Sequence, residues 1–379
     1  MFGMGTSLGG KVVAVADIGS ASAGFAVFRT GRAPQLYAFA RESLPFENRS
    51  DNALATGVVQ ALSTACEKAL TEYAAQKGPR ISSSYCVVGA PWTHSFAGAA
   101  LGELKREATI TDAMISGLAK QALADQKKID ASAMFEANVV RVLLNGYATE
   151  EPAGKRAETI RVFTLMSDCD QQVQNGAKEV LGKFLPGTPV IWRSGARAAL
   201  SVAKRLLGDG SYLIVEVGGE ATDLISVRKG ILEGRDSIPQ GVRQIASSLA
   251  KGKPVEETVA LLDMIERQQS ESDAANELEQ AVAKFEPELA HIFGETFAKL
   301  SGSRKLPETL VLLAPSQLSR WLSRFFSRID FTQFTATAQP FAVTSLSAGE
   351  LLPVAQIPSS FADTGLALGC ALVNIESDS

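Results

Sequence analysis

The sequence has few residues of the kinds that build metal centres and nucleophilic triads. Its 379 residues include only two histidines and four cysteines. Two histidines leave almost nothing for a histidine-rich metal centre or for a triad that needs a histidine base. The cysteines are spaced too widely for a CxxC metal site and lie in apolar or helical contexts, at Cys66, Cys86, Cys169 and Cys370. We therefore expect reduced thiols in or near the core.

Excess positive charge and long apolar runs are also missing. Lys and Arg number 37 against 41 for Asp and Glu, which gives a formal charge of -4, and no basic run is interleaved with aromatics. No nucleic-acid partner is expected. No apolar run reaches the roughly 18 residues that a spanning helix needs, and the opening MFGMGTSLGG lacks the features of a signal peptide. We expect a cytoplasmic protein with no direct membrane span, which a partner could recruit to the inner face of the cytoplasmic membrane.

What the chain does contain is a repeated pattern. An apolar content of 46% with 21% charged residues predicts a folded globular protein. Residues 11–46 read as two β-rich apolar runs, joined by a turn of small residues, and a third alternating strand. Residues 211–241 again read as strand, tight turn, strand, turn and strand. An internal duplication with an acidic, glycine-containing turn in each copy predicts two similar lobes.

The two turns suggest a phosphate site. A turn of glycine and hydroxyl residues lets backbone N–H groups approach phosphate oxygens closely, and an acid at the strand end can hold Mg²⁺ through its water shell. A single such turn is better interpreted as an ordinary hairpin, in which glycine supplies positive φ and the acid a local cap. The duplication favours the phosphate interpretation. The candidate nucleotide-binding residues are Asp17, Gly19, Ser20, Ser22, Glu216, Gly218, Gly219, Thr222 and Asp223, with Asp17 and Glu216 as candidate metal ligands.

The chain between the repeats changes character. From Ser95 to about Thr164 a predicted helix and two strands around a Pro/Gly turn indicate a small α+β insert. We therefore divide the chain into a first part of lobe 1 (1–81), an insert (82–164), the end of lobe 1 (165–194), lobe 2 (195–355) and a C-terminal helix that returns to lobe 1 (356–379).

Two motifs resemble those of a known superfamily. The segment ADIGSASAGFAVF resembles the first phosphate motif of the actin, heat-shock-70 and sugar-kinase superfamily. SYLIVEVGGEATDLISVRKGIL with the following DSIPQGVRQI closely resembles the second phosphate segment of its bacterial FtsA and PilM branch. The insert is similar to the SHS2 subdomain of that branch. The resemblance implies an α/β, two-lobed actin/Hsp70-like fold of duplicated βββαβα units with a small α+β insert.

Departures from the family pattern shape the functional expectation. Glu216 stands where the family usually has Asp, no lysine follows the first turn, Pro315 lies in the adenosine-binding loop, and Arg193 aligns with an expected acid. A base that orients water is therefore missing. We expect ATP and Mg²⁺ binding to be weakened or lost, and ATPase activity to be weak or absent.

The resemblance implies a cytoplasmic scaffold that links or polymerises with membrane-anchored machinery, in cell division or in type IV pilus or secretion assembly. Its expected partners are a membrane-anchored protein, through that protein's cytoplasmic peptide, and further copies of the chain. The alternatives are an active ATP-binding filament protein and a sugar or acyl kinase of the same superfamily. The kinase would need an acidic base facing the cleft, and no carboxylate stands out near Arg193 to Gly195.

Overall fold

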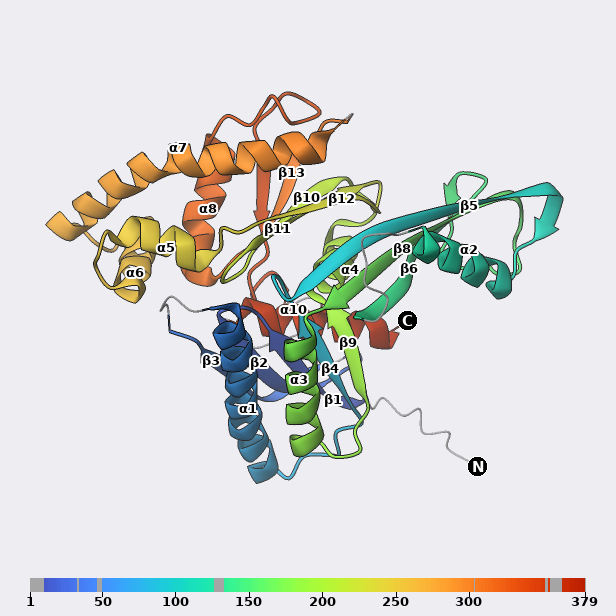
Figure 1. Cartoon of the computed structure of the whole chain (residues 1–379), viewed down its shortest axis with the longest axis horizontal. Helices are drawn as coiled ribbons and strands as arrows, with labels where there is room; N and C mark the ends of the chain where they lie inside the picture. Colours follow the sequence, from blue (N-terminus) through green and yellow to red (C-terminus); the bar gives the residue numbers. More distant parts are fainter. Residues whose placement is uncertain are drawn as a thin grey trace, which may run out of the picture.

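Two five-stranded sheets and one four-stranded sheet organise the computed structural model (Figure 1). The structure describes residues 10–32, 34–45, 50–125, 133–302, 304–351, 354 and 363–378. Most of the opening segment MFGMGTSLGG thus lies outside the described residues, as does the start of the predicted C-terminal part at 356–362. The two five-stranded sheets belong to two lobes, and the third sheet belongs to an insert that projects to one side (Figure 1).

The first lobe is built on a meander with two parallel strands beside it. Its sheet has the order β3-β2-β1-β4-β9, in which β1, β2 and β3 are antiparallel, and β4 and β9 continue the sheet in parallel. These strands are β1 (Val12–Ile18), β2 (Ser22–Arg29), β3 (Gln35–Ser43), β4 (Ser83–Val88) and β9 (Val190–Ser194). The apolar sides of α1 (Asp51–Ala75) and α3 (Gln171–Phe184) pack on one face of this sheet.

The second lobe repeats this topology strand for strand. Its sheet has the order β12-β11-β10-β13-β14, again with three antiparallel strands followed by two parallel ones. The strands are β10 (Tyr212–Val217), β11 (Thr222–Arg228), β12 (Ile231–Ile238), β13 (Thr309–Leu313) and β14 (Ala342–Ser345). One face carries α5 (Val242–Ala250), α6 (Val255–Glu266), α7 (Asp273–Ser301) and α8 (Ser316–Arg328). The predicted duplication is therefore confirmed.

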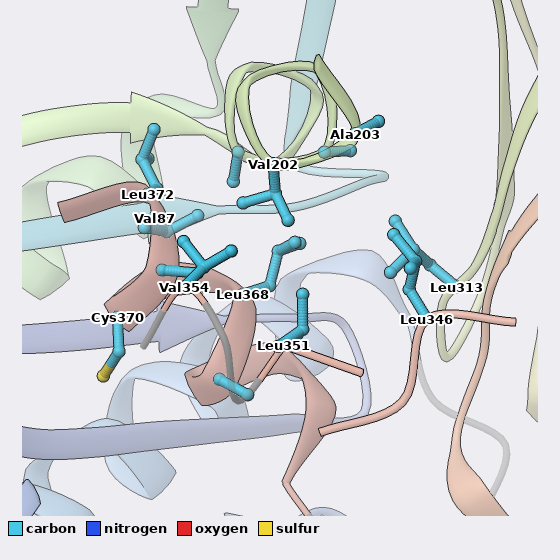
Figure 2. Packing of buried hydrophobic residues seen from close by; sticks show 14 of the residues in the cluster. Val87, Val202, Ala203, Leu313, Leu346, Leu351, Val354, Leu368, Cys370 and Leu372 are labelled. Carbon is cyan, nitrogen blue, oxygen red and sulfur yellow. The ribbon is translucent and has the colours of Figure 1, made fainter. Parts of the chain in front are cut away.

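Two helices fill the space between the lobes. The helices α4 (Gly195–Leu207) and α10 (Thr364–Asp378) share one apolar core with the inner faces of both sheets. Figure 2 shows Val202 of α4 and Leu368 of α10 near Val87 of the first sheet, while Leu313 of the second sheet lies to one side beside Leu346, in the same core cluster. The helix α10 is apolar around nearly its whole circumference because it touches α4 on one side and the first sheet on the other. This shared core, which lies between the two sheets, joins the lobes.

The insert is a four-stranded antiparallel sheet covered by one helix. Its strands have the order β5-β8-β6-β7, and the apolar face of α2 packs on one side. The elements are β5 (Thr93–Thr109), α2 (Asp112–Ala124), β6 (Met134–Leu144), β7 (Tyr147–Ala148) and β8 (Arg156–Cys169). The insert sheet thus runs from Thr93 to Cys169, and β4, at the start of the range 82–164, lies in the first sheet. The α/β fold with two lobes and a small α+β insert is confirmed.

Candidate functional site

The two predicted turns have the same backbone geometry. In the first, the Gly19 N–H donates to the Ser22 carbonyl at 3.0 Å, and in the second the Gly218 N–H donates to the Ala221 carbonyl at 2.9 Å. None of Gly19, Gly218 and Gly219 has a φ in the left-handed region. Positive φ is therefore not the reason for glycine here, and the reason must lie in what surrounds each turn.

The turns contact one another directly. The Ser20 hydroxyl accepts a hydrogen bond from the Glu220 N–H at 2.9 Å, and the Ser20 side chain is fully buried. A Cβ added to Gly219 would lie 2.4 Å from the Ala21 Cβ and 2.8 Å from the Ala21 nitrogen. Glycine is needed at 219 because the opposite turn occupies the place of a side chain. The same contact excludes a phosphate group from the space between Ser20 and Gly219.

The helix that follows the second turn closes it from the other side. The first N–H groups of α5, from Val242 and Arg243, donate to the carbonyls of Gly218 at 2.9 Å and Gly219 at 3.0 Å. A Cβ on Gly241 would lie 2.4 Å from the Gly219 oxygen. Helix N-termini bind anions through such free N–H groups. In α5 these two donors already have backbone partners.

An arginine pairs with an acid of each meander. In the first lobe, Arg41 of β3 forms ion pairs with Asp17 at the end of β1 and with Asp363 just before α10. Burial raises the pKa of Asp17, while Arg41 opposes this rise. In the second lobe, Arg235 of β12 forms an ion pair with the buried Asp223. One arginine thus offsets part of the negative charge at each turn.

Glu216 is the second predicted metal ligand, at the end of β10. Burial raises the pKa of Glu216 to about 8, the carboxylates of Asp223 and Asp17 add to the rise, and Arg235 opposes it. This rise disfavours the charged carboxylate, which is the form that Mg²⁺ prefers as a ligand. Within the described residues, no three His, Cys, Asp or Glu side chains are grouped so that they could hold a metal ion.

This shifted pKa predicts the pH dependence of a Glu216→Gln variant. Because the folded protein holds a proton on Glu216 that the unfolded chain releases above pH 4.5, stability is expected to fall as the pH rises from about 4.5 to about 8. The variant should escape this loss of roughly 1.4 kcal/mol per pH unit. Urea denaturation of both proteins across the window measures the difference. Parallel pH profiles for the two proteins would contradict the assignment.

The remaining predicted residues are also engaged. The Ser22 hydroxyl accepts from Arg41 Nη1 at 2.7 Å, and the buried Thr222 hydroxyl donates to the Gln240 carbonyl at 2.6 Å. Trp92, whose place beside an apolar stretch predicts core or rim packing, is buried and donates its indole N–H to the Gly19 carbonyl at 3.0 Å. All nine candidate residues lie at the junction of the lobes. In this arrangement the space between the turns does not accommodate Mg²⁺ and a nucleotide phosphate.

A cavity of about 570 Å³ lies beside the second turn, where both lobes meet the base of the insert. Three of its four carboxylates accept hydrogen bonds from neighbours. Asp170 caps α3 by accepting from the Val173 N–H at 2.9 Å, Asp168 accepts from the His94 N–H at 3.1 Å, and Glu220 accepts from Arg243 Nε at 2.7 Å. The lining residues are Asp51, Leu54, Pro91, Trp92, His94, Ala133, Asp168, Cys169, Asp170, Glu220, Ala221, Pro239, Arg243 and Gln244.

Comparison with known proteins supports the fold. No family model matches the chain, and no curated protein matches it. Among solved structures, a PilM-PilN type IV pilus biogenesis complex aligns with 15% identity over 96% of this chain and 98% of that chain, with a TM-score of 0.59. The ethanolamine utilization protein EutJ from Carboxydothermus hydrogenoformans aligns with 14% identity over 95% and 89%, with a TM-score of 0.47. The ROK hexokinase from Thermus thermophilus aligns with 16% identity over 95% and 97%, with a TM-score of 0.36. The chain has the two-lobed actin-like ATPase fold that its motifs resemble.

Proposed function

We propose that this protein is a cytoplasmic actin-like scaffold that links or polymerises with membrane-anchored machinery, and that its lobes stay closed without nucleotide. The observation that carries the proposal is the direct contact of the two turns, through Ser20 and the Glu220 N–H at 2.9 Å. A nucleotide bound between such turns would bridge the lobes through its phosphates. Here protein atoms supply the bridge.

Further contacts between the lobes support a fixed closed state. Arg141 of the insert donates to both carboxylate oxygens of Asp209 in the second lobe, at 2.6 and 2.9 Å. Arg235 of β12 donates to the Thr93 carbonyl at the start of β5, at 3.4 Å. The insert thus bridges the lobes on one side and α4 with α10 on another. A rigid arrangement of this kind suits a platform for partners.

The proposed partner is a membrane-anchored protein that offers a cytoplasmic peptide. The PilM structure that aligns with this chain is a complex with PilN. By analogy, we assign this chain to type IV pilus or secretion assembly, with cell division as the second process. In the parts of the chain that the structure describes, none of the helices has the length and hydropathy needed to cross a membrane. Recruitment to the inner face of the membrane would then depend on the partner.

A nucleotide titration tests the closed scaffold. Titrating the full chain with a fluorescent ATP analogue and Mg²⁺ should give no saturable binding at high micromolar nucleotide, because the turns occupy one another's space. Sedimentation with and without ATP should then give the same distribution of assemblies. Saturable binding that Asp17→Ala abolishes, or polymerisation that requires ATP, would instead support the alternative of an active ATP-binding filament protein.

Crosslinking in the native cell identifies the process served. The expected product is an adduct with the cytoplasmic segment of a membrane-anchored protein, and it should form equally when nucleotide is depleted. An adduct with pilus or secretion proteins would support the first assignment, and an adduct with cell-division proteins would support the second. If the chain crosslinks only to further copies of itself, the result would support polymerisation but would contradict the proposal of a membrane-anchored partner.

The acids near the cavity give the kinase alternative less support. The carboxylates Asp168, Asp170 and Glu220 beside the cavity each accept hydrogen bonds from neighbouring groups. At the position where an acid was expected, Arg193 donates to Glu376 of α10 at 2.9 Å. A general base must lie within hydrogen-bond reach of the proton that it abstracts, and an arginine stands at the position where the resemblance implies an acid. We therefore favour the scaffold.

A further inference from the structure

We propose that Arg41 is a built-in cation that takes the place of a divalent metal ion at the acidic end of the first turn. The inference rests on the proposed function in one respect, since both require that the closed state form without Mg²⁺ and nucleotide. It goes further by naming the group that replaces the ion. It also assigns that group a role in joining the first turn to the C-terminal helix.

The register of the first sheet places Arg41 in line with Asp17. Asp17 of β1 lies opposite Gly24 of β2, and Gly24 lies opposite Arg41 of β3. Residues opposite one another in antiparallel strands project from the same face. Because Gly24 has no side chain, the Arg41 guanidinium passes over it and forms an ion pair with Asp17. A side chain at 24 would block this path, since its Cβ would lie 2.7 Å from Arg41 Nη2.

A second glycine makes room on the opposite side. Gly365, in the first turn of α10, lies against the ion pair, and a Cβ there would lie 2.3 Å from Asp17 Oδ2 and 3.1 Å from Arg41 Nη2. Neither Gly24 nor Gly365 has a φ in the left-handed region, so backbone conformation does not require glycine at either place. Both residues are explained by the space that the guanidinium and Asp17 occupy.

The groups around the guanidinium are oxygen ligands of the type that a divalent cation takes. Arg41 donates to the carboxylates of Asp17 and Asp363, and to the Ser22 hydroxyl at 2.7 Å. Two carboxylates and a hydroxyl are hard oxygen donors, which suit Mg²⁺ or Mn²⁺. The fork of the guanidinium meets three of them at once because its N–H groups point in fixed directions. Arg41 therefore meets all three donors and offsets one of the two carboxylate charges.

The same pairing ties the chain end to the first turn. Asp363 precedes α10, which packs between the lobes, and Asp17 begins the turn that contacts the second lobe. One guanidinium thus connects β1, β3 and the start of α10. The second lobe repeats part of this device, because Arg235 on the third strand of its meander pairs with Asp223. An actin-like chain that folds around fixed cations has no need of a bound ion to set its turns.

Replacing Arg41 tests the proposal. In Arg41→Met the side chain keeps similar length but loses its charge, so Asp17 and Asp363 face one another without a cation. We expect the Tm of this variant to fall by about 4–6 °C in the absence of divalent ions. Millimolar Mg²⁺ or Mn²⁺ should restore a large part of the loss, and Mn²⁺ binding should become detectable by electron paramagnetic resonance. The wild-type protein should show neither effect.

Two further variants separate the charge from the shape of the side chain. Arg41→Met combined with Asp17→Asn removes one carboxylate, so its Tm should exceed that of Arg41→Met without metal and should no longer respond to Mn²⁺. Arg41→Lys keeps the charge and should bind no Mn²⁺. Gly365→Ala, which crowds the pair without changing charge, should lower the Tm with no response to metal.

Several outcomes would overturn the proposal. The first is Mn²⁺ binding by the wild-type protein at this site. The second is an Arg41→Met variant whose Tm does not change when divalent ions are added. The third is an Arg41→Met variant that remains unfolded with and without Mn²⁺. Failure of the proposed function is read separately, from ATP binding by the wild-type chain. A wild-type protein that binds ATP while Arg41→Met alone gains Mn²⁺ binding would refute the nucleotide-free scaffold and leave the role of Arg41 standing.

Discussion

Glu136→Ala is expected to loosen the insert from the first lobe and to lower the free energy of unfolding by about 3–5 kcal/mol. Glu136 lies on β6 and is 3% exposed. Its Oε2 accepts from the Ser194 N–H at 3.0 Å and from the Ser194 hydroxyl at 2.7 Å. Removing the carboxylate leaves these buried donors without a partner, which costs more than the bond itself contributed.

The position of Glu136 explains the size of this effect. Ser194 is the N-cap of α4, so the carboxylate stands at the positive end of that helix dipole. Arg193 lies beside it, with Nε 3.9 Å from Glu136 Oε1, and also pairs with Glu376 of α10. One side chain of the insert thereby contacts the segment that begins the inter-lobe core. Burial raises the pKa of Glu136, while the bonds from Ser194 and the nearby arginines lower it.

Chemical denaturation measures the loss, and hydrogen exchange of the β6 amides shows where it occurs. Glu136→Gln is the matched control because its amide oxygen still accepts from Ser194, so it should lose much less. Glu150→Ala removes an exposed carboxylate from the same insert and should change stability by less than about 0.5 kcal/mol. A Glu136→Ala protein as stable as Glu150→Ala would show that the insert is held by other contacts.

Gly219→Arg is expected to separate the two turns and open the lobes. The side chain has no space, because its first carbon would lie 2.4 Å from the Ala21 Cβ and 2.9 Å from Ser20 Oγ. Overpacking of this kind costs about 1–3 kcal/mol or more, and the lobes relieve it by moving apart. Small-angle scattering should therefore give a larger radius of gyration, and the Glu220 amide should exchange faster because it loses Ser20 as acceptor.

Control substitutions separate this contact from a general effect of losing glycine. Gly182 in α3 has no neighbouring atom within 4 Å of an added Cβ, so Gly182→Ala should stabilise the helix by roughly 0.5–1 kcal/mol. Gly241→Ala introduces a Cβ 2.4 Å from the Gly219 oxygen and should destabilise the same junction from the α5 side. If Gly219→Arg kept the radius of gyration and the slow Glu220 exchange of the wild type, the turns would not be in contact in solution.

The two meanders of the fold were predictable because residues close together in the sequence indicate their strands and turns. Alternating apolar residues and a small-residue turn specify each meander over about thirty residues, and both meanders form the expected strands. The repeat then predicted two similar lobes, and the two sheets share one strand order. Glu216 and Asp17 also occupy equivalent places, each at the end of the central strand of its lobe. The nine candidate residues accordingly come together at one junction.

The partners of these residues were not predictable in the same way. Arg41 is 24 residues from Asp17 in the sequence and 322 from Asp363, and the pairing of β2 with β3 shifts register between Val27 and Phe28. The spacing along the chain therefore does not show which side chain reaches Asp17. Gly24 and Gly365 carried no signal either, because a glycine that makes room for a neighbour is not distinguished by composition from one in a turn.

The amino-acid sequence by itself determined the two duplicated meanders, the α+β insert and the position of an acid and a glycine at each turn, since neighbouring residues encode periodicity and turn chemistry. Only the tertiary structure decided that the turns touch at Ser20 and Gly219, that arginines pair with Asp17 and Asp223, and that burial raises the pKa of Glu216. Those features depend on how two lobes pack. Packing brings together groups that lie about 200 residues apart along the chain.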